Sequence, residues 1–264
     1  MKNRLRIALV QMFCEKGTIE QNMALMADYI EEAESRSIDI IGFPEASLTG
    51  YHEPVRFPKA VLSLDGPEVA ELLKLTEGRN LTVLAGIIEE NSDGLPYITH
   101  IIARNGKIIG YHRKMYDGDN EEDPRFAMGN EIAVFDCDGL IFGIAICADI
   151  SKEELFAECS RRGARMIFEL AAPGLYGEQA TRDWKAGYVW WEGECLKFLT
   201  EYAKKYGIWI AVATQAGRTS DEDFPGGGYL FNPRGERVYS TKDWNPCVVY
   251  LEIDLDTLEV TELT

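Results

Sequence analysis

Histidine is scarce in this chain, whose 264 residues include only His52, His100 and His112. A cysteine nucleophile is commonly activated by a histidine, so such a site would have to use one of these three. His100 lies in an apolar, strand-like segment and is expected to pack inside the protein, whereas sequence position leaves His52 and His112 open as bases. The shortage makes the carboxylates further candidates for the base of a cysteine nucleophile.

Paired cysteines are also lacking. The six cysteines are scattered, without a C-x-x-C pair or a Cys/His cluster at zinc spacing, so no metal site is expected. The N-terminus opens directly into a strand-like run without the apolar core of a signal peptide, which favours a cytoplasmic protein with reduced cysteines.

Basic residues are too few for a nucleic-acid-binding protein. The 27 lysines and arginines face 44 acidic residues, and the formal charge of −17 disfavours both nucleic acid and an anionic membrane surface. No apolar run approaches the roughly 20 residues that cross a bilayer. The expected partner is therefore a small molecule.

The pattern of apolar runs and turns predicts a mixed α/β protein. The length suits one domain over residues 1–264, in which two halves, each with several strands and two helices, form two face-to-face sheets with helices outside. Residues 174–193, rich in glycine and aromatics, are expected to border a site or an interface. Strands are expected at residues 5–12, 38–43, 81–88, 97–103, 107–112, 131–137, 140–146, 165–170, 208–214, 229–232, 237–240 and 246–253, and helices at 18–36, 66–75, 152–162 and 190–206.

The segment around Cys147 is the most informative one. The apolar run 140–146 predicts a buried strand that ends on Cys147, and Ser151 with Glu154 forms a capping-box pattern at the start of a helix. Backbone N–H groups left free at such a junction can lower the pKa of a thiol and can bind an oxyanion. A buried structural cysteine is the alternative.

Two charged residues follow other predicted strands in the same way. Glu45 comes shortly after the strand 38–43, and Lys114 follows the strand 107–112. Each could be a solvated loop charge when taken singly. Together with Cys147, however, they are the residue types needed for a base, an oxyanion stabiliser and a nucleophile.

The order and spacing of these segments resemble the nitrilase, or carbon–nitrogen hydrolase, superfamily. Phe43-Pro-Glu45-Ala-Ser-Leu-Thr-Gly-Tyr51, Tyr111-His-Arg-Lys114 and Gly143-Ile-Ala-Ile-Cys147-Ala-Asp149 look like its three motifs, and the likeness extends over nearly the whole chain. The resemblance implies an α-β-β-α four-layer sandwich, commonly a homodimer or higher homo-oligomer, without a cofactor.

The resemblance also implies a catalytic triad of Glu45, Lys114 and Cys147 that hydrolyses a small amide through a thioester. The backbone N–H of Ala148 would help to stabilise the oxyanion, and Glu122 would orient the substrate and the lysine. Tyr51, Asp149 and Trp191 are further candidates for substrate binding.

The chain departs from the family pattern outside the triad, and several branches are disfavoured. The length argues against a glutaminase domain of NAD synthetase, and Ala148-Asp149 resembles amidases and carbamoyl hydrolases more than true nitrilases. An N-carbamoyl amine hydrolase, a nitrilase and a non-catalytic binding protein of the same fold stay open as alternatives.

The charges around the expected site predict the polarity of the substrate. An arginine clamp for a carboxylate is absent just after the cysteine motif, and the nearby loops carry Glu53, Asp117, Asp119, Glu121 and Asp123. We therefore expect a neutral or cationic amide. Arginines that reach the pocket would reverse this preference, and Arg56, Arg125 and Arg182 are the candidates.

Overall fold

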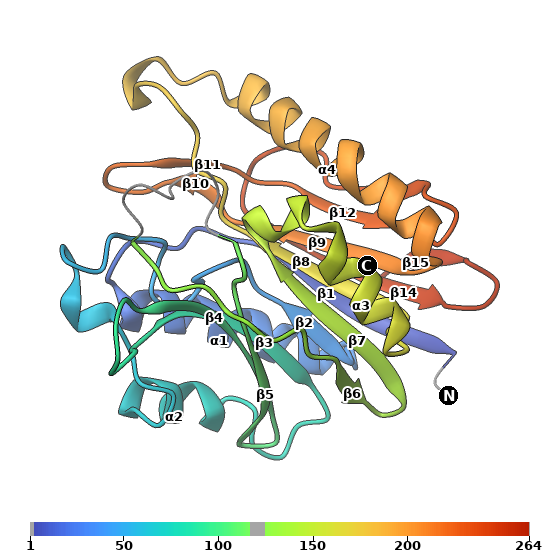
Figure 1. The fold of residues 1–264 in the computed structure, drawn as a ribbon, viewed down its shortest axis with the longest axis horizontal. Coiled ribbons are helices and arrows are strands. Elements are labelled where there is room, and N and C mark those ends of the chain that lie inside the picture. The colour runs from blue at the N-terminus through green and yellow to red at the C-terminus, as the bar shows by residue number, and fades with distance from the viewer. Residues whose placement is uncertain (1–2, 117–124, 264) are drawn as a thin grey trace.

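Two β-sheets pack face to face, and helices cover their outer faces (Figure 1). The structure is a computed structural model that describes residues 3–116 and 125–263. Helices α1 and α2 lie on one side of the sheet pair, and α3 and α4 lie on the other. The expected α-β-β-α sandwich is confirmed.

The first sheet has the strand order β15-β14-β1-β2-β3-β4-β5. Strand β2 runs parallel to its neighbours β1 and β3, whereas β4 and β5 continue the sheet as antiparallel strands. Its elements and the helices over it are β1 (Arg4–Gln11), α1 (Ile19–Ser35), β2 (Ile40–Gly42), η1 (Pro58–Ala60), α2 (Pro67–Lys74), β3 (Thr82–Glu89), β4 (Tyr97–Arg104), β5 (Lys107–Arg113), β14 (Cys247–Asp254) and β15 (Val260–Glu262).

The second sheet has the order β13-β12-β9-β8-β7-β6, with β7, β8 and β9 parallel. Two short strands, β10 and β11, form a separate ribbon. The elements of this half are β6 (Phe135–Cys137), β7 (Leu140–Ile146), η2 (Cys147–Ser151), α3 (Glu153–Arg161), β8 (Met166–Ala171), η3 (Gln179–Thr181), α4 (Trp184–Tyr206), β9 (Trp209–Thr214), β10 (Ala216–Arg218), β11 (Asp223–Pro225), β12 (Gly228–Phe231) and β13 (Arg237–Ser240).

The apolar core forms three layers, because both faces of each sheet are covered. Alternate residues of a strand enter different layers: in β8, Phe168 and Leu170 pack between the sheets, while Ile167 and Ala171 pack under α3 and α4. A third layer joins the first sheet to α1 and α2. In the described part of the chain, no helix is long and apolar enough to span a membrane.

Several element boundaries differ from the sequence-based expectation. Neither predicted capping box forms, because the hydroxyls of Thr18 and Ser151 donate to the carbonyls of Glu15 and Ala148 instead. Strand β6 is limited to three residues, and β10, β11 and β15 were not expected.

Helix α4 begins six residues earlier than predicted, because the Asp183 carboxylate caps it by accepting the N–H of Ala186 at 3.0 Å. The second half of the segment 174–193 is therefore helical.

Candidate active site

Three strands deliver Glu45, Lys114 and Cys147 to one end of the sheet pair. Lys114 directly follows β5, Cys147 directly follows β7, and Glu45 lies three residues after the end of β2. Glu45 comes from the first sheet and Cys147 from the second, so the candidate site forms where the two sheets meet.

Glu45 and Lys114 form a buried ion pair. Lys114 Nζ donates to Glu45 Oε1 at 2.7 Å, and the other oxygen of Glu45 accepts the N–H of Ala172 at 2.9 Å. Burial raises the pKa of Glu45, although Lys114, the Cys147 thiol and Ala172 oppose this. Burial by itself would lower the pKa of Lys114, but attraction to Glu45 and Cys147 places it well above its ordinary value. Glu45 is thus a stronger base than a solvated carboxylate, next to a lysine that stays charged.

Cys147 is half-buried beside this pair. Burial and the Glu45 carboxylate raise its pKa well above that of a free thiol, and this outweighs the opposing effects of Lys114 and the Ala172 N–H. A backbone N–H does lower this pKa, as expected, but the net shift is upward. The resting thiol is protonated, so it needs a base, and Glu45 is in interaction range.

The backbone around the site is tightly constrained. Cys147 has a left-handed backbone with φ of 50°, which turns the chain sharply at the end of β7. The Asp149 carboxylate stabilises this turn, because its two oxygens accept the N–H groups of Met115 and Ile146, each at 3.0 Å. Asp149 therefore joins the Lys114 and Cys147 segments, and its expected role in substrate binding stays a prediction.

The other expected site residues have mixed outcomes. The Tyr51 ring lies 5.8 Å from Lys114 Nζ, so the structure places it at the site. Ala148 is half-buried in η2, next to Cys147. Trp191 is a buried residue of α4 itself, and its indole N–H donates to the Thr214 hydroxyl at 2.9 Å, so its contacts are those of a core residue. Glu122 lies outside the described residues.

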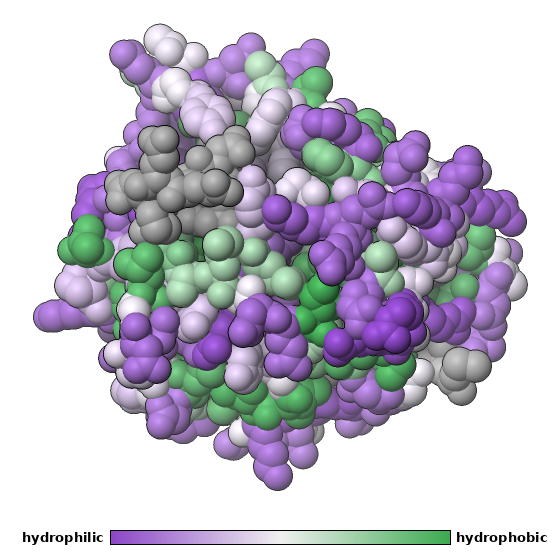
Figure 2. Space-filling view, in the orientation of Figure 1, coloured by the Kyte–Doolittle hydropathy of each residue, from purple (hydrophilic) through white to green (hydrophobic). Residues whose placement is uncertain are grey.

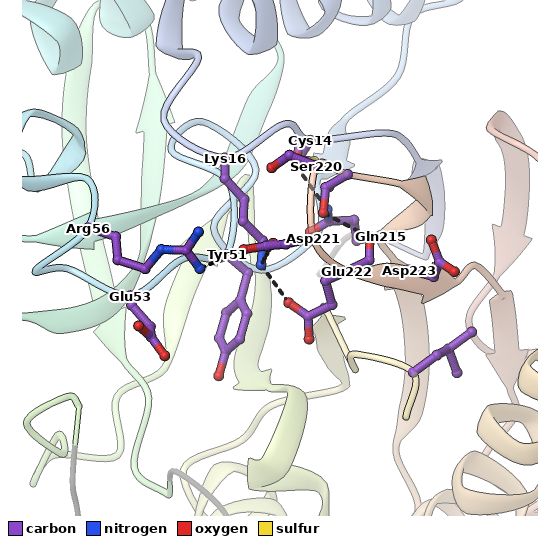
Figure 3. Close-up of polar contacts among 12 residues, drawn as sticks. Cys14, Lys16, Tyr51, Glu53, Arg56, Gln215, Ser220, Asp221, Glu222 and Asp223 are labelled. Carbon is purple, nitrogen blue, oxygen red and sulfur yellow. Dashed lines mark hydrogen bonds and ion pairs between the residues drawn. The ribbon is translucent and has the colours of Figure 1, made fainter. Parts of the chain in front are cut away.

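A cavity of about 140 Å³ adjoins Tyr51 and carries charges of both signs. Figure 3 shows Lys16 reaching towards Asp221 and Glu222, which it contacts at 2.6 and 2.8 Å. Arg56 contacts Asp221 at 2.7 Å. The lining residues are Lys16, Tyr51, His52, Glu53, Arg56, Phe57, Arg125, Asp221 and Glu222.

The expected acidic rim is only partly visible. Of its five residues only Glu53 is described, and it lies 3.9 Å from Arg125. Asp117, Asp119, Glu121 and Asp123 lie outside the described residues. Arg56 and Arg125 do line the cavity, whereas Arg182 binds Asp223 at 2.7 Å and is largely buried.

The histidines have no direct place in the triad. His100 and His112 are opposite each other on β4 and β5, and His112 Nε2 lies 3.6 Å from Asp149. Burial lowers the pKa of His52, and it lowers the pKa of His100 to about 3. Among the described residues, no group of three or more His, Cys, Asp or Glu side chains is placed to hold a metal ion.

Two residues at the site were missed by the sequence reasoning. Ala172 contributes only its backbone N–H, which no sequence pattern shows. Glu169 is fully buried in β8, and a single acid within the apolar run 166–171 was the signal that could have drawn attention to it.

Comparisons with known proteins show which family the chain matches. The family model for carbon-nitrogen hydrolases matches residues 6–262. The chain is 24% identical over 256 residues to the glutamine-dependent NAD(+) synthetase of Acinetobacter baylyi, covering 95% of this chain and 44% of that protein. It is 26% identical over 269 residues to nitrilase homolog 2 of Dictyostelium discoideum, with 97% of this chain and 77% of that protein covered.

The solved structures show the same fold. The NAD+ synthetase of Acinetobacter baumannii has a TM-score of 0.80 at 22% identity, over 99% of this chain and 48% of that one. An amidase of the nitrilase superfamily from Nesterenkonia AN1 has a TM-score of 0.78 at 19% identity, over 97% and 95%.

The first curated relatives are about twice as long as the matched region, since the chain spans 42–44% of two NAD(+) synthetases. This similarity runs against the expectation that disfavoured that branch. The family match over nearly the whole chain and the shared fold lead to one conclusion: the chain belongs to the carbon–nitrogen hydrolase family of the nitrilase superfamily.

Proposed function

We propose that this protein is a cysteine-dependent hydrolase that cleaves the carbon–nitrogen bond of a small amide. The observation that carries the proposal is the buried Glu45–Lys114 ion pair beside Cys147. Burying two charges costs several kcal/mol per ion, so such a pair at strand ends needs a purpose beyond stability. In carbon–nitrogen hydrolysis, Glu45, Lys114 and Cys147 would each have a chemical role.

In the proposed reaction, Glu45 removes the thiol proton and the Cys147 sulfur attacks the carbonyl carbon. Lys114 and the backbone N–H of Ala148 stabilise the oxyanion of the tetrahedral intermediate. Collapse breaks the carbon–nitrogen bond, and the proton held by Glu45 passes to the departing ammonia or amine. Water, deprotonated by Glu45, then hydrolyses the thioester, and Cys147 recovers its proton.

A neutral amide is the proposed substrate, and Glu122 is proposed to help orient it. The charges of the described cavity largely pair with each other, since Lys16 and Arg56 both contact Asp221. An excess charge on the substrate would have to compete with these pairs. The relatives include an amidase, an omega-amidase and glutamine-dependent synthetases, so primary amides, glutamine included, are the first compounds to test.

Replacement of Cys147 by alanine tests the proposal. The protein should release ammonia from at least one compound in a panel of small amides, N-carbamoyl amines and nitriles, and Cys147→Ala should lower kcat/KM by several orders of magnitude. Cys247→Ala is the matched control, because Cys247 is also half-buried but lies in β14. Retention of a tenth of the activity by Cys147→Ala would disprove the assignment.

A binding protein without turnover is the alternative of another class. Iodoacetamide followed by mass spectrometry distinguishes the two. In a hydrolase, Cys147 should react far faster than the other five cysteines, four of which have their pKa raised by burial without a base paired to them. Uniform slow labelling, together with no ammonia release, would favour the binding protein.

A further inference from the structure

Glu169 is a buried acid that the proposed mechanism does not use. It lies in β8, where it pairs in register with Ala145 of β7 and Val212 of β9. Its alternation with Phe168 and Leu170 puts it on the sheet face covered by α3 and α4. The side chain is fully buried, directly behind the Cys147 turn.

The groups that face Glu169 are mostly acidic. Asp149 and Cys147 approach from η2, Glu45 from the end of β2 and Cys195 from α4, while Lys114 at the end of β5 is the cation that acts on it. The backbone N–H of Cys147 approaches Glu169, but neither carboxyl oxygen meets hydrogen-bond geometry with any described residue.

The neighbouring acids differ from Glu169 in their partners. Asp149 accepts two backbone N–H groups, and Glu45 accepts Lys114 and the N–H of Ala172. Three buried carboxylates beside one lysine cannot all be ionised at low cost, so the acid whose oxygens lack a well-formed hydrogen bond from a described residue is the one that keeps its proton. Burial, and then the charges of Asp149 and Glu45, raise the pKa of Glu169 well above its ordinary value.

We propose that Glu169 is a neutral carboxylic acid behind the Cys147 turn, and that its neutrality allows Cys147 to lose its proton. Glu169 is a positioning residue that acts through Cys147 and does not touch the substrate. The catalytic consequence of this inference rests on the proposed function, whereas the protonation state of Glu169 does not. An ionised Glu169 would add a second anion next to the sulfur and would oppose thiolate formation.

The protonation state can be measured with Glu169→Gln, which has the same shape and no charge. The infrared carbonyl band of a protonated acid should be present in the wild type at pH 7 and missing in the variant. Because the folded state retains a proton that the unfolded chain loses, the wild type should also lose stability relative to Glu169→Gln as pH rises above the unfolded pKa. For each pH unit, the unfolding equilibrium constant of the wild type should rise by up to about tenfold relative to that of Glu169→Gln. Lack of the band, or a pH-independent difference in stability, would overturn the proposal.

The effect on the nucleophile is read from the rate at which iodoacetamide alkylates Cys147. At pH 7 the wild type and Glu169→Gln should react within about threefold of each other. At higher pH, Cys147 should be alkylated faster in the variant than in the wild type, because only the wild type gains an ionised Glu169 next to the sulfur. A larger difference at pH 7, or no divergence before the wild type unfolds, would contradict the inference.

Two further variants complete the design. Glu89→Gln is the matched control, because Glu89 is also a buried acid but accepts hydrogen bonds from Arg113 and Thr99. It should destabilise the protein without changing the pH profile of Cys147. If Glu169→Gln does not fold, Glu169→Met replaces it as a neutral side chain of similar length. None of these measurements needs an amide substrate, so failure of hydrolysis would disprove the proposed function and leave this inference standing.

Discussion

At the scale of single residues, the lysine of the candidate site combines two roles that can be separated. Lys114 donates to Glu45 at 2.7 Å, and in the proposed mechanism it also stabilises the developing oxyanion. The first role concerns stability, because the carboxylate is fully buried, and the second concerns rate.

Lys114→Met should therefore lose both stability and activity. The uncompensated carboxylate should cost up to about 3–5 kcal/mol in the free energy of unfolding, less whatever protonation of Glu45 recovers. The loss of a charged oxyanion donor should lower kcat by roughly 100- to 1,000-fold. Urea titration and steady-state kinetics measure the two effects.

A double variant separates them. Lys114→Met combined with Glu45→Gln removes the buried charge and should recover most of the stability, while activity stays lost. If the double variant is as unstable as the single one, the ion pair is not the source of the stability change. Recovered activity would contradict the proposed roles of both residues.

At the scale of elements, the position of Glu45 depends on a close approach between its segment and β3. A Cβ at Gly86 would lie 2.3 Å from the backbone nitrogen of Ala46 and 3.0 Å from the carbonyl carbon of Glu45. The Leu48 N–H also donates to the Gly86 carbonyl at 2.9 Å. Only glycine allows this contact, because the clashing atoms belong to the backbone.

Gly86→Ala should destabilise the protein by a few kcal/mol and lower activity, since the Glu45 segment would have to move. Gly193→Ala is the matched control: it lies on the exposed face of α4 with nothing within 4 Å of its Cβ position, so it should stabilise by up to about 1 kcal/mol. Thermal unfolding compares the two. Equal melting temperatures for Gly86→Ala and the wild type would show that the segment adapts freely.

The elements also show what sequence patterns can predict. Strand β7 was predicted to the residue, because an apolar run ends in a sharp turn. The strands predicted on either side of Asn105-Gly106 and of Asp138-Gly139 pair as hairpins, since both dipeptides are typical hairpin turns. The start of α4 was missed because its capping aspartate follows a glycine-rich stretch that reads as a loop. The two capping boxes failed because a hydroxyl can donate to a nearby carbonyl as readily as it accepts an N–H.

The candidate site was predictable only in part, because local sequence patterns do not show contacts between distant segments. Glu45, Lys114 and Cys147 could be found because each follows a strand in a recognisable motif. The roles of Asp149 and Ala172 depend on backbone N–H groups that arrive from other segments of the chain, and these contacts exist only once the sheets are packed. The burial of Trp191 was not predictable, because an aromatic residue on a helix shows no sign of which face is buried.

At the scale of the whole molecule, the formal net charge of −17 is not reflected in the described lining of the cavity next to Tyr51. Figure 2 shows hydrophilic side chains over most of one face, with apolar groups in scattered patches. The cavity next to Tyr51 has three basic and three acidic residues in its lining. In the described part of the chain, the charges that line this cavity therefore balance, whereas the charge of the whole sequence is strongly negative. A single domain, a cytoplasmic location and a homodimer or higher homo-oligomer remain predictions.

Stability of the whole molecule should fall in mild acid because of a buried histidine between the sheets. Neither ring nitrogen of His100 has a hydrogen-bond partner among the described residues, and burial lowers its pKa from 6.5 to about 3. The folded state therefore binds fewer protons than the unfolded state between these two values. The stabilising contribution of the neutral imidazole is complete above about pH 6.5 and is lost as pH falls towards 3, at about 1.4 kcal/mol per pH unit.

His100→Leu should flatten this dependence, because leucine has no proton to gain. The expected result is a variant whose urea midpoint falls less than that of the wild type between pH 7 and pH 5, whatever its stability at pH 7. The remaining slope should come from other groups, including His52, whose pKa is also lowered by burial. Parallel curves for the variant and the wild type would show that His100 already binds its proton in the folded protein, against the direction that burial gives.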